Sequence, residues 1–170
     1  MSLKWIGAIL IIVGCGGVGF SMALSHRNQM KELQQLLSAL DYMQCELQYR
    51  LTPLPDLCRQ TAAHAQSGIK TLFATLAAEL EDQVSPDVMS CMRSAIVKTG
   101  QLSDKAATVA ANLGRTMGRF DLDGQLMGLE IARRECRQML DDLNHNRDTR
   151  LRSYQTLGLC AGAALAILFL

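Results

Sequence analysis

Aromatic and charged side chains are scarce in this sequence. Phe, Trp and Tyr make up 5% of its 170 residues, and Asp, Glu, Lys and Arg make up 19%. Hairpin dipeptides and β-branched runs are rare, which argues against a β-sandwich or a β-barrel, and three prolines beside 49% hydrophobic residues argue against disorder. The formal net charge of +1 lacks the basic excess that nucleic-acid binding requires. The composition therefore favours an all-α protein with no nucleic-acid partner.

Signatures of catalysis and of cofactor or metal binding are also missing. No Cys-x-x-Cys pair or nucleophile elbow occurs, and the glycines of Gly14–Gly19 lie in an apolar run without the ending of a phosphate-binding loop. The single Asp142-x-x-His145 pair falls short of the paired Glu-x-x-His motifs of a di-iron bundle. We expect no catalytic residue, no cofactor and no metal ion. One acidic cluster is interpreted as a solvated surface: Glu79, Glu81, Asp82 and Asp87.

Both ends of the chain lack charge over long runs. No Lys, Arg, Asp or Glu occurs between Lys4 and Arg27 or after Arg152. The run from Trp5 to Leu24 has the length of a membrane-spanning helix of about 20 residues, with an aromatic residue at its edge. The run from Tyr154 to Leu170 is at the lower limit for a span. A buried helix or an interfacial one would also fit this second run.

We therefore divide the chain into a transmembrane segment at residues 1–25, a helical domain at 26–153 and a second transmembrane segment at 154–170. Small residues recur every four positions in both membrane segments, and this spacing lets two membrane helices approach closely. The candidate packing residues are Cys15, Gly19, Ala23, Gly158, Gly162 and Ala166.

Basic residues predict the side of the membrane on which the helical domain lies. Arg147, Arg150 and Arg152 precede the second segment, and no base follows it. The positive-inside rule therefore predicts a cytoplasmic domain. The spacing of the six cysteines is not that of a disulfide framework, which favours reduced thiols and therefore also the cytoplasm.

Two other interpretations of the first segment stay open. One lysine followed by an apolar run is also typical of a cleaved signal peptide. The stretch from Ile12 to Cys15 has the apolar-x-small-Cys form that bacterial lipoprotein processing recognises, although the chain then stays apolar up to Leu24. An outward-facing helical lipoprotein or sensor, anchored through Cys15, is therefore the alternative to a cytoplasmic domain.

Apolar periodicity predicts two long helices, one at each end of the helical domain. The first covers Arg27–Tyr49 and continues from the first membrane segment. The last begins with Asp121 as its N-cap, runs to Arg152 and continues into the second membrane segment. Each is long enough to pack against the other as an antiparallel stalk.

Four shorter helices are expected between them. Thr52 as N-cap and Pro53 in the first turn begin the second helix, which is expected to run to about Gln66. Ser67-Gly68 breaks the chain before a third helix at Ile69–Glu81. Two further helices follow Ser85-Pro86-Asp87 and the N-cap Ser103. The predicted fold is all-α, a small six-helix bundle whose long first and last helices continue into N- and C-terminal membrane helices.

Three motifs taken together resemble one protein family. They are Leu47–Pro55, then Leu113–Asp121 followed by Gln125, and Tyr154–Gly158 before the apolar C-terminus. Their order, the chain length and both apolar ends resemble the stage III sporulation protein AB family of endospore-forming bacteria over essentially the whole chain. Met117 departs from the pattern, which more often has Leu, and this exchange keeps the side-chain volume.

The resemblance implies a function that the spacing of residues does not. Family members belong to a secretion-like complex between mother cell and forespore, and their helical domain is similar to the cytoplasmic domains of type II secretion and type IV pilus platform proteins. This implies a non-enzymatic membrane platform or scaffold, with its domain on the mother-cell side of the outer forespore membrane. The implied partners are the membrane, a companion sporulation ATPase and other components of the complex, and a homo-oligomer is a further option.

Two of the motifs hold the candidate interaction residues. Gly114, Gly118 and Asp121 lie at the predicted break before the last helix, where we expect a hinge or docking surface. The alternative is a tight helix–helix corner in which Asp121 is only an N-cap, and Thr52 and Pro53 are open to the same two interpretations. The full candidate set is Thr52, Pro53, Leu54, Leu113, Gly114, Gly118, Asp121 and Gln125.

Overall fold

The computed structural model describes residues 27–82, 87–100, 102–118 and 121–169, with side chains up to residue 145. Within these ranges all regular secondary structure is helical. Residues 27–50 are helical and are called the N-terminal helix. The other five helices are α2 Leu54–His64, α3 Ser67–Glu81, α4 Val88–Thr99, α5 Asp104–Thr116 and α6 Leu122–Phe169. The prediction of an all-α fold with six helices is confirmed for the described part of the chain.

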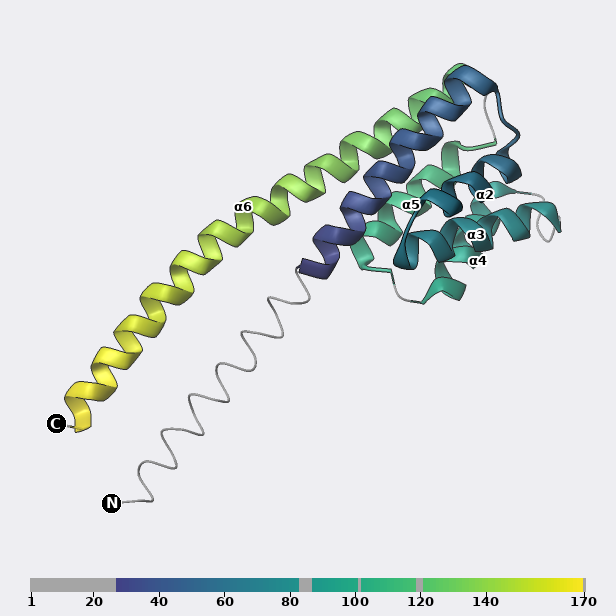
Figure 1. The fold of residues 1–170 in the computed structure, drawn as a ribbon. Helices are drawn as coiled ribbons and strands as arrows, with labels where there is room; N and C mark the ends of the chain where they lie inside the picture. The colour runs from purple at the N-terminus through teal and green to yellow at the C-terminus, as the bar shows by residue number, and fades with distance from the viewer. Residues whose placement is uncertain (1–26, 83–86, 101, 119–120, 170) are drawn as a thin grey trace.

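The N-terminal helix and α6 form an antiparallel pair. Arg133 of α6 donates to Asp41, and Cys136, one turn further on, donates through its thiol to the backbone oxygen of Leu33. The residue number thus rises on one helix as it falls on the other. Figure 1 shows the two helices side by side, with α6 extending far beyond the bundle toward the C-terminus. The predicted stalk is confirmed where both helices are described.

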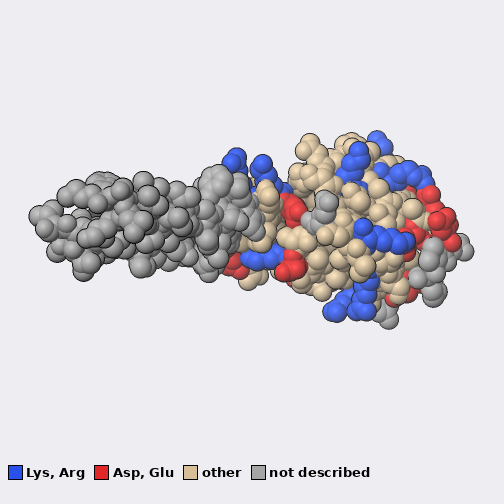
Figure 2. All heavy atoms as spheres, turned by 90° about the horizontal axis from the view of Figure 1, so that it is seen from below, with Lys and Arg blue, Asp and Glu red and all other residues tan. Residues whose placement is uncertain are grey.

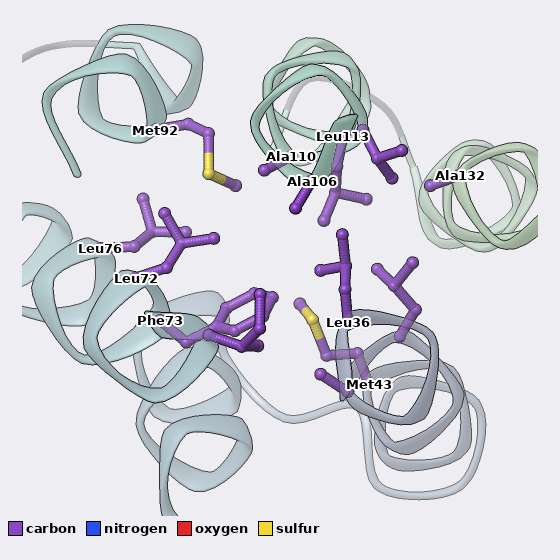
Figure 3. Packing of buried hydrophobic residues seen from close by; sticks show 14 of the residues in the cluster. Leu36, Met43, Leu72, Phe73, Leu76, Met92, Ala106, Ala110, Leu113 and Ala132 are labelled. Carbon is purple, nitrogen blue, oxygen red and sulfur yellow. The ribbon is translucent and has the colours of Figure 1, made fainter. Parts of the chain in front are cut away.

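Helices α2 to α5 fill the side of this pair, and each packs against the next along the chain. Their apolar faces meet in one core. Figure 3 shows Phe73, Met92 and Leu113 pointing toward Leu36 and Met43 of the N-terminal helix. The residues whose apolar spacing places them on the inward faces and which are buried include Leu33, Leu36, Leu40, Met43, Leu47, Leu57, Leu72, Phe73, Leu76, Met92, Ala106, Val109, Ala110, Leu113, Leu129, Cys136, Leu140 and Leu143.

The start of α2 differs from the prediction. Thr52 is not the N-cap, because Pro53 occupies that position with extended backbone angles and Leu54 is the first helical residue. The second proline, Pro55, lies in the first turn with either start and so permits this one. Proline is favoured in the first helical turn, where a backbone N–H has no partner within the helix. The first bond of the helix runs from the N–H of Leu57 to the carbonyl of Pro53 at 2.8 Å.

The junction between α2 and α3 is also displaced from its predicted place. Helix α2 ends at His64, two residues before the predicted end, and α3 begins at Ser67. Ala65 and Gln66 adopt extended backbone angles and make the break. Gly68 was predicted to interrupt the chain but lies inside α3. Glycine weakens a helix without preventing it where the buried Ile69 anchors the first turn.

The predicted membrane segments stay predictions. Residues 1–25 lie outside the described part of the chain, whereas the backbone of α6 is helical through Phe169. Among the described residues, no helix is long and apolar enough to cross a membrane. The division at residues 26–153 therefore rests on the sequence. The predicted packing residues lie outside the described side chains: Cys15, Gly19, Ala23, Gly158, Gly162 and Ala166.

Candidate functional site

The candidate residues lie at or next to the end of the bundle where α6 begins. This end lies opposite to the C-terminal extension of α6 and at the upper right of Figure 1. A Cβ atom on Gly118 would lie 2.5 Å from Cγ2 of Val88 and 3.5 Å from Cδ2 of Leu54. The turn after α5 therefore touches the first residues of α2 and α4. We call residues 49–54, 87–88, 117–118 and 121–122 the distal end.

Glycines allow the helices to approach closely next to this end. A Cβ on Gly114 of α5 would lie 2.8 Å from the Cβ of Met92 in α4, and one on Gly128 of α6 would overlap Thr116. Gly118 has φ +73°, a backbone conformation that favours glycine. Leu113 and Gly114 are buried between helices. For these two residues the structure supports the interpretation as a tight helix–helix corner.

Asp121 caps α6, as predicted. Its Oδ1 accepts a hydrogen bond from the N–H of Gly124 at 3.1 Å, and its backbone oxygen accepts one from Gln125 at 3.0 Å. The side-chain bond satisfies an N–H group that the first turn of a helix leaves without a partner, and the backbone bond is the first one within the helix. The carboxylate also lies at the positive end of the helix dipole. A further role of Asp121 in docking stays a prediction, as it does for Thr52, Pro53 and Gln125.

Two apolar side chains at the distal end are exposed and were missed by the sequence analysis. Tyr49 is 78% exposed and Leu51 is 65% exposed. Leu51 also has φ +53°, which is rare for a residue with a bulky side chain. The signal in the sequence was their place off the inward-facing stripe that ends at Leu47. Their position inside the Leu47–Pro55 motif is the second signal.

A partly buried arginine joins the two long helices. The side chain of Arg133 is 18% exposed and donates to Asp41 at 2.5 Å and to Gln44, both on the N-terminal helix. It also pairs with Glu130 on its own helix at 2.8 Å. Apolar periodicity alone does not indicate that Arg133 reaches across to the other helix.

The acidic cluster does not behave as one solvated surface, contrary to the prediction. Glu79 is only 4% exposed, and it accepts hydrogen bonds from Lys98 and from Ser94, 2.5 and 2.7 Å away. These bonds hold the pKa of Glu79 below its ordinary value, against the opposing effect of burial. Glu81 is exposed and pairs with Arg59. Glu79 was misplaced because its partners on α4 are fifteen and nineteen residues away.

The remaining titratable groups give no clear site for chemistry. Among the described residues no group of three His, Cys, Asp or Glu is arranged to hold a metal ion. Cys45, Cys58 and Cys136 form no disulfide. Burial raises the pKa of Cys58 to about 12 and that of Cys136 to about 11, so both thiols stay protonated at neutral pH. Figure 2 shows Lys and Arg spread over the bundle, with no single basic patch on that face.

Comparison with known proteins agrees with the features of the sequence and the fold. The model of the family described as stage III sporulation protein AB matches residues 4–170. Stage III sporulation protein AB of Bacillus subtilis (strain 168) is 26% identical over 171 residues, which cover 99% of each chain. A solved structure of stage III sporulation protein AB (SpoIIIAB) has a TM-score of 0.63 at 22% identity and covers 72% of this chain and 98% of that one. The chain belongs to the stage III sporulation protein AB family.

Proposed function

We propose that this member of a sporulation family is a non-enzymatic membrane platform, or scaffold, of a secretion-like complex between mother cell and forespore. It is anchored in the membrane at both ends and engages a companion cytoplasmic ATPase. Its other partners are components of the same complex, and further copies of this chain are a third kind of partner. The domain lies in the mother-cell cytoplasm at the outer forespore membrane.

The observation that carries this proposal is that α6 is unbroken and is bonded to the N-terminal helix. α6 is a single helix of 48 residues, and at 1.5 Å per residue it is about 70 Å long. It starts at the distal end and its backbone stays helical to Phe169, within the predicted membrane segment. A displacement at the distal end would therefore reach the predicted membrane segment without a flexible linker.

The contacts between the two long helices make them one mechanical unit. Leu33, Leu40 and Leu47 of the N-terminal helix are buried in the same core as Leu129 and Cys136 of α6. Arg133 adds polar bonds across the outer side of the pair. Because both helices point toward predicted membrane segments, a load on the bundle would be shared by both anchors.

The cytoplasmic location is supported by the bases and the thiols. Arg147, Arg150 and Arg152 precede the second predicted segment, as the positive-inside rule requires. Cys45, Cys58 and Cys136 form no disulfide, and reduced thiols are typical of a reducing compartment.

A native thiol allows the location to be tested. Cys45 is exposed on the N-terminal helix, whereas Cys58, Cys91 and Cys136 are buried. Growing cells that express the full chain in their plasma membrane are treated with a membrane-impermeant maleimide before or after lysis, and Cys45→Ser is the control that identifies the labelled residue. We expect labelling at Cys45 only after lysis. Labelling in intact cells would overturn the proposal in favour of an outward-facing protein anchored through Cys15.

The ATPase partnership is tested by co-purification. The full chain, solubilised in detergent, carries an affinity tag and is mixed with the purified companion ATPase, with and without nucleotide. We expect saturable binding to the wild-type chain. If the purified ATPase does not bind the wild-type chain under either condition, the proposal that this chain is a platform for the ATPase is wrong.

A further inference from the structure

Three consecutive residues project from the distal end where the N-terminal helix finishes. Tyr49, Arg50 and Leu51 are all exposed, the Arg50 side chain by 72%. Arg50 has one weak ion pair, with Glu46 at 3.7 Å. Tyrosine and arginine are enriched among the residues that dominate binding energy in protein interfaces. We call these three residues the distal triplet.

The direction of the chain limits what can cover the distal triplet. The N-terminal helix starts, and α6 extends, at the other end of the bundle (Figure 1). The chain that follows residue 145 continues α6 away from the triplet. A partner in trans, on the side opposite to the predicted membrane, is therefore the occupant that fits this place.

We infer that the distal triplet is the docking point for the companion ATPase, an inference that rests on the proposed function. The surface of the ATPase that fits it is apolar, to cover Tyr49 and Leu51, and carries carboxylates around the apolar centre, to pair with Arg50. A contact at this point acts on the N-terminal helix next to the first residues of α6. The load then enters the paired helices at the end furthest from their predicted anchors.

The backbone of Leu51 gives a variant that removes the contact without harming the fold. At φ +53° asparagine is better tolerated than leucine, so Leu51→Asn keeps or improves stability while it removes the apolar side chain. The matched control is Val97→Asn. Val97 is 79% exposed on α4 and borders a shallow groove between α4 and α5, away from the distal end.

The experiment compares the affinity of the full-length variants for the purified ATPase. We expect Leu51→Asn and Tyr49→Ala each to weaken binding by about tenfold or more, whereas Val97→Asn binds like the wild type. Equal binding by the wild type and Leu51→Asn overturns the inference and leaves the proposed function standing. Loss of binding in Val97→Asn alone also overturns it, because the α4–α5 groove is then the docking surface.

Charge reversal tests the chemistry assigned to the partner. Arg50→Glu is compared with Arg50→Gln at low and at high salt. Facing carboxylates make the glutamate variant weaker than the glutamine variant, and screening reduces this difference as salt rises. If Arg50→Glu binds at least as well as Arg50→Gln at low salt, the ATPase surface is not acidic and the inference is wrong on this point. In both experiments thermal unfolding by circular dichroism confirms that each variant is folded.

Discussion

Three glycines show two reasons why a side chain is not tolerated at a position: backbone strain at positive φ and overlap with a neighbouring atom. Gly100 has φ +61°, but a Cβ there would come no nearer than 3.9 Å to another atom. Gly114 lies inside α5 with helical backbone angles, but its Cβ would overlap Met92. Gly118 combines a positive φ with an overlap at Val88. The three positions therefore represent strain alone, overlap alone and both together.

The three alanine variants are expected to lose stability to different extents, least with strain alone and most with strain and overlap together. Gly100→Ala should lower the free energy of unfolding by about 1 kcal/mol, and Gly114→Ala by about 1–3 kcal/mol. Gly118→Ala should have the largest effect, about 2–4 kcal/mol, because both terms add. Urea unfolding of the full chain, followed by circular dichroism, measures the differences. A Gly118→Ala effect no larger than that of Gly100→Ala would contradict the overlap with Val88.

At the scale of helices, Arg133 is the residue that fixes how the two long helices pair. Arg133→Met keeps much of the length of the side chain but removes its bonds to Asp41 and Gln44. We expect a loss of about 1–3 kcal/mol, the range for hydrogen bonds to charged groups. Arg134 is the control, because it is 77% exposed and pairs only along its own helix, with Glu130.

A double-mutant cycle isolates the contact between the helices. Arg133→Met and Asp41→Ala are measured singly and together in the same unfolding assay. Because the two side chains touch, the combined effect should be smaller than the sum of the single effects by about 0.5–1 kcal/mol or more. Additive effects would show that Asp41 does not contribute to the pairing.

The link between α3 and α4 depends on pH through Glu79. Its folded-state pKa lies below the ordinary value of 4.5, because Lys98 and Ser94 bind the charged form. This contribution to stability is therefore complete above the unfolded pKa and is lost as the pH falls through the lower, folded pKa. Glu79→Gln should be less stable than the wild type at pH 7, because it loses the charge-assisted bond to Lys98. The gap should narrow as the pH is lowered below about 4.5, which unfolding curves from pH 7 to 3 would reveal. A constant gap would mean that Glu79 stays protonated or unpaired.

The helices were predictable from the sequence because apolar spacing fixes the faces that they bury. Leu33, Leu40 and Leu47 face inward for this reason, and Asp121 caps α6 as a residue of its type does. The start of α2 was not predictable to the residue, since Thr52 and Pro53 suit a helix start as well as Pro53 and Leu54 do. Arg133 and Glu79 were missed because their partners are remote in the sequence, and a periodic pattern carries no information about distant pairs.

The candidate site was predictable in part, because turns can be recognised from local sequence whereas contacts between helices cannot. The sequence indicated the turns at residues 52–54 and 113–121, and the structure brings them together through Leu54 and Gly118. It did not indicate that Gly114 is buried or that Tyr49 and Leu51 are exposed. Burial depends on which helices meet, and that is a property of the assembled bundle.

At the scale of the whole molecule, the unbroken backbone of α6 connects the bundle to the predicted membrane segment. Thr149→Pro places a helix breaker in α6, beyond the described side chains. Proline removes a backbone bond and costs about 3 kcal/mol locally, but the bundle up to residue 145 should unfold as in the wild type. If stiffness transmits load, sporulation efficiency should fall with Thr149→Pro and not with Thr149→Ala. Normal sporulation in a proline variant that is present at wild-type level would contradict transmission through a stiff α6.

The pairing of the first helix with the last has a consequence for the order of events during synthesis. Helices α3, α4 and α5 can each pack on the helix made just before, since these neighbours along the chain are also neighbours in space. The N-terminal helix is made first, yet the arginine that binds Asp41 is made 92 residues later. Until then part of the apolar stripe through Leu33 and Leu40 has no cover. At about 5–20 residues per second, that interval lasts several seconds, during which a chaperone or the membrane surface has access to the stripe.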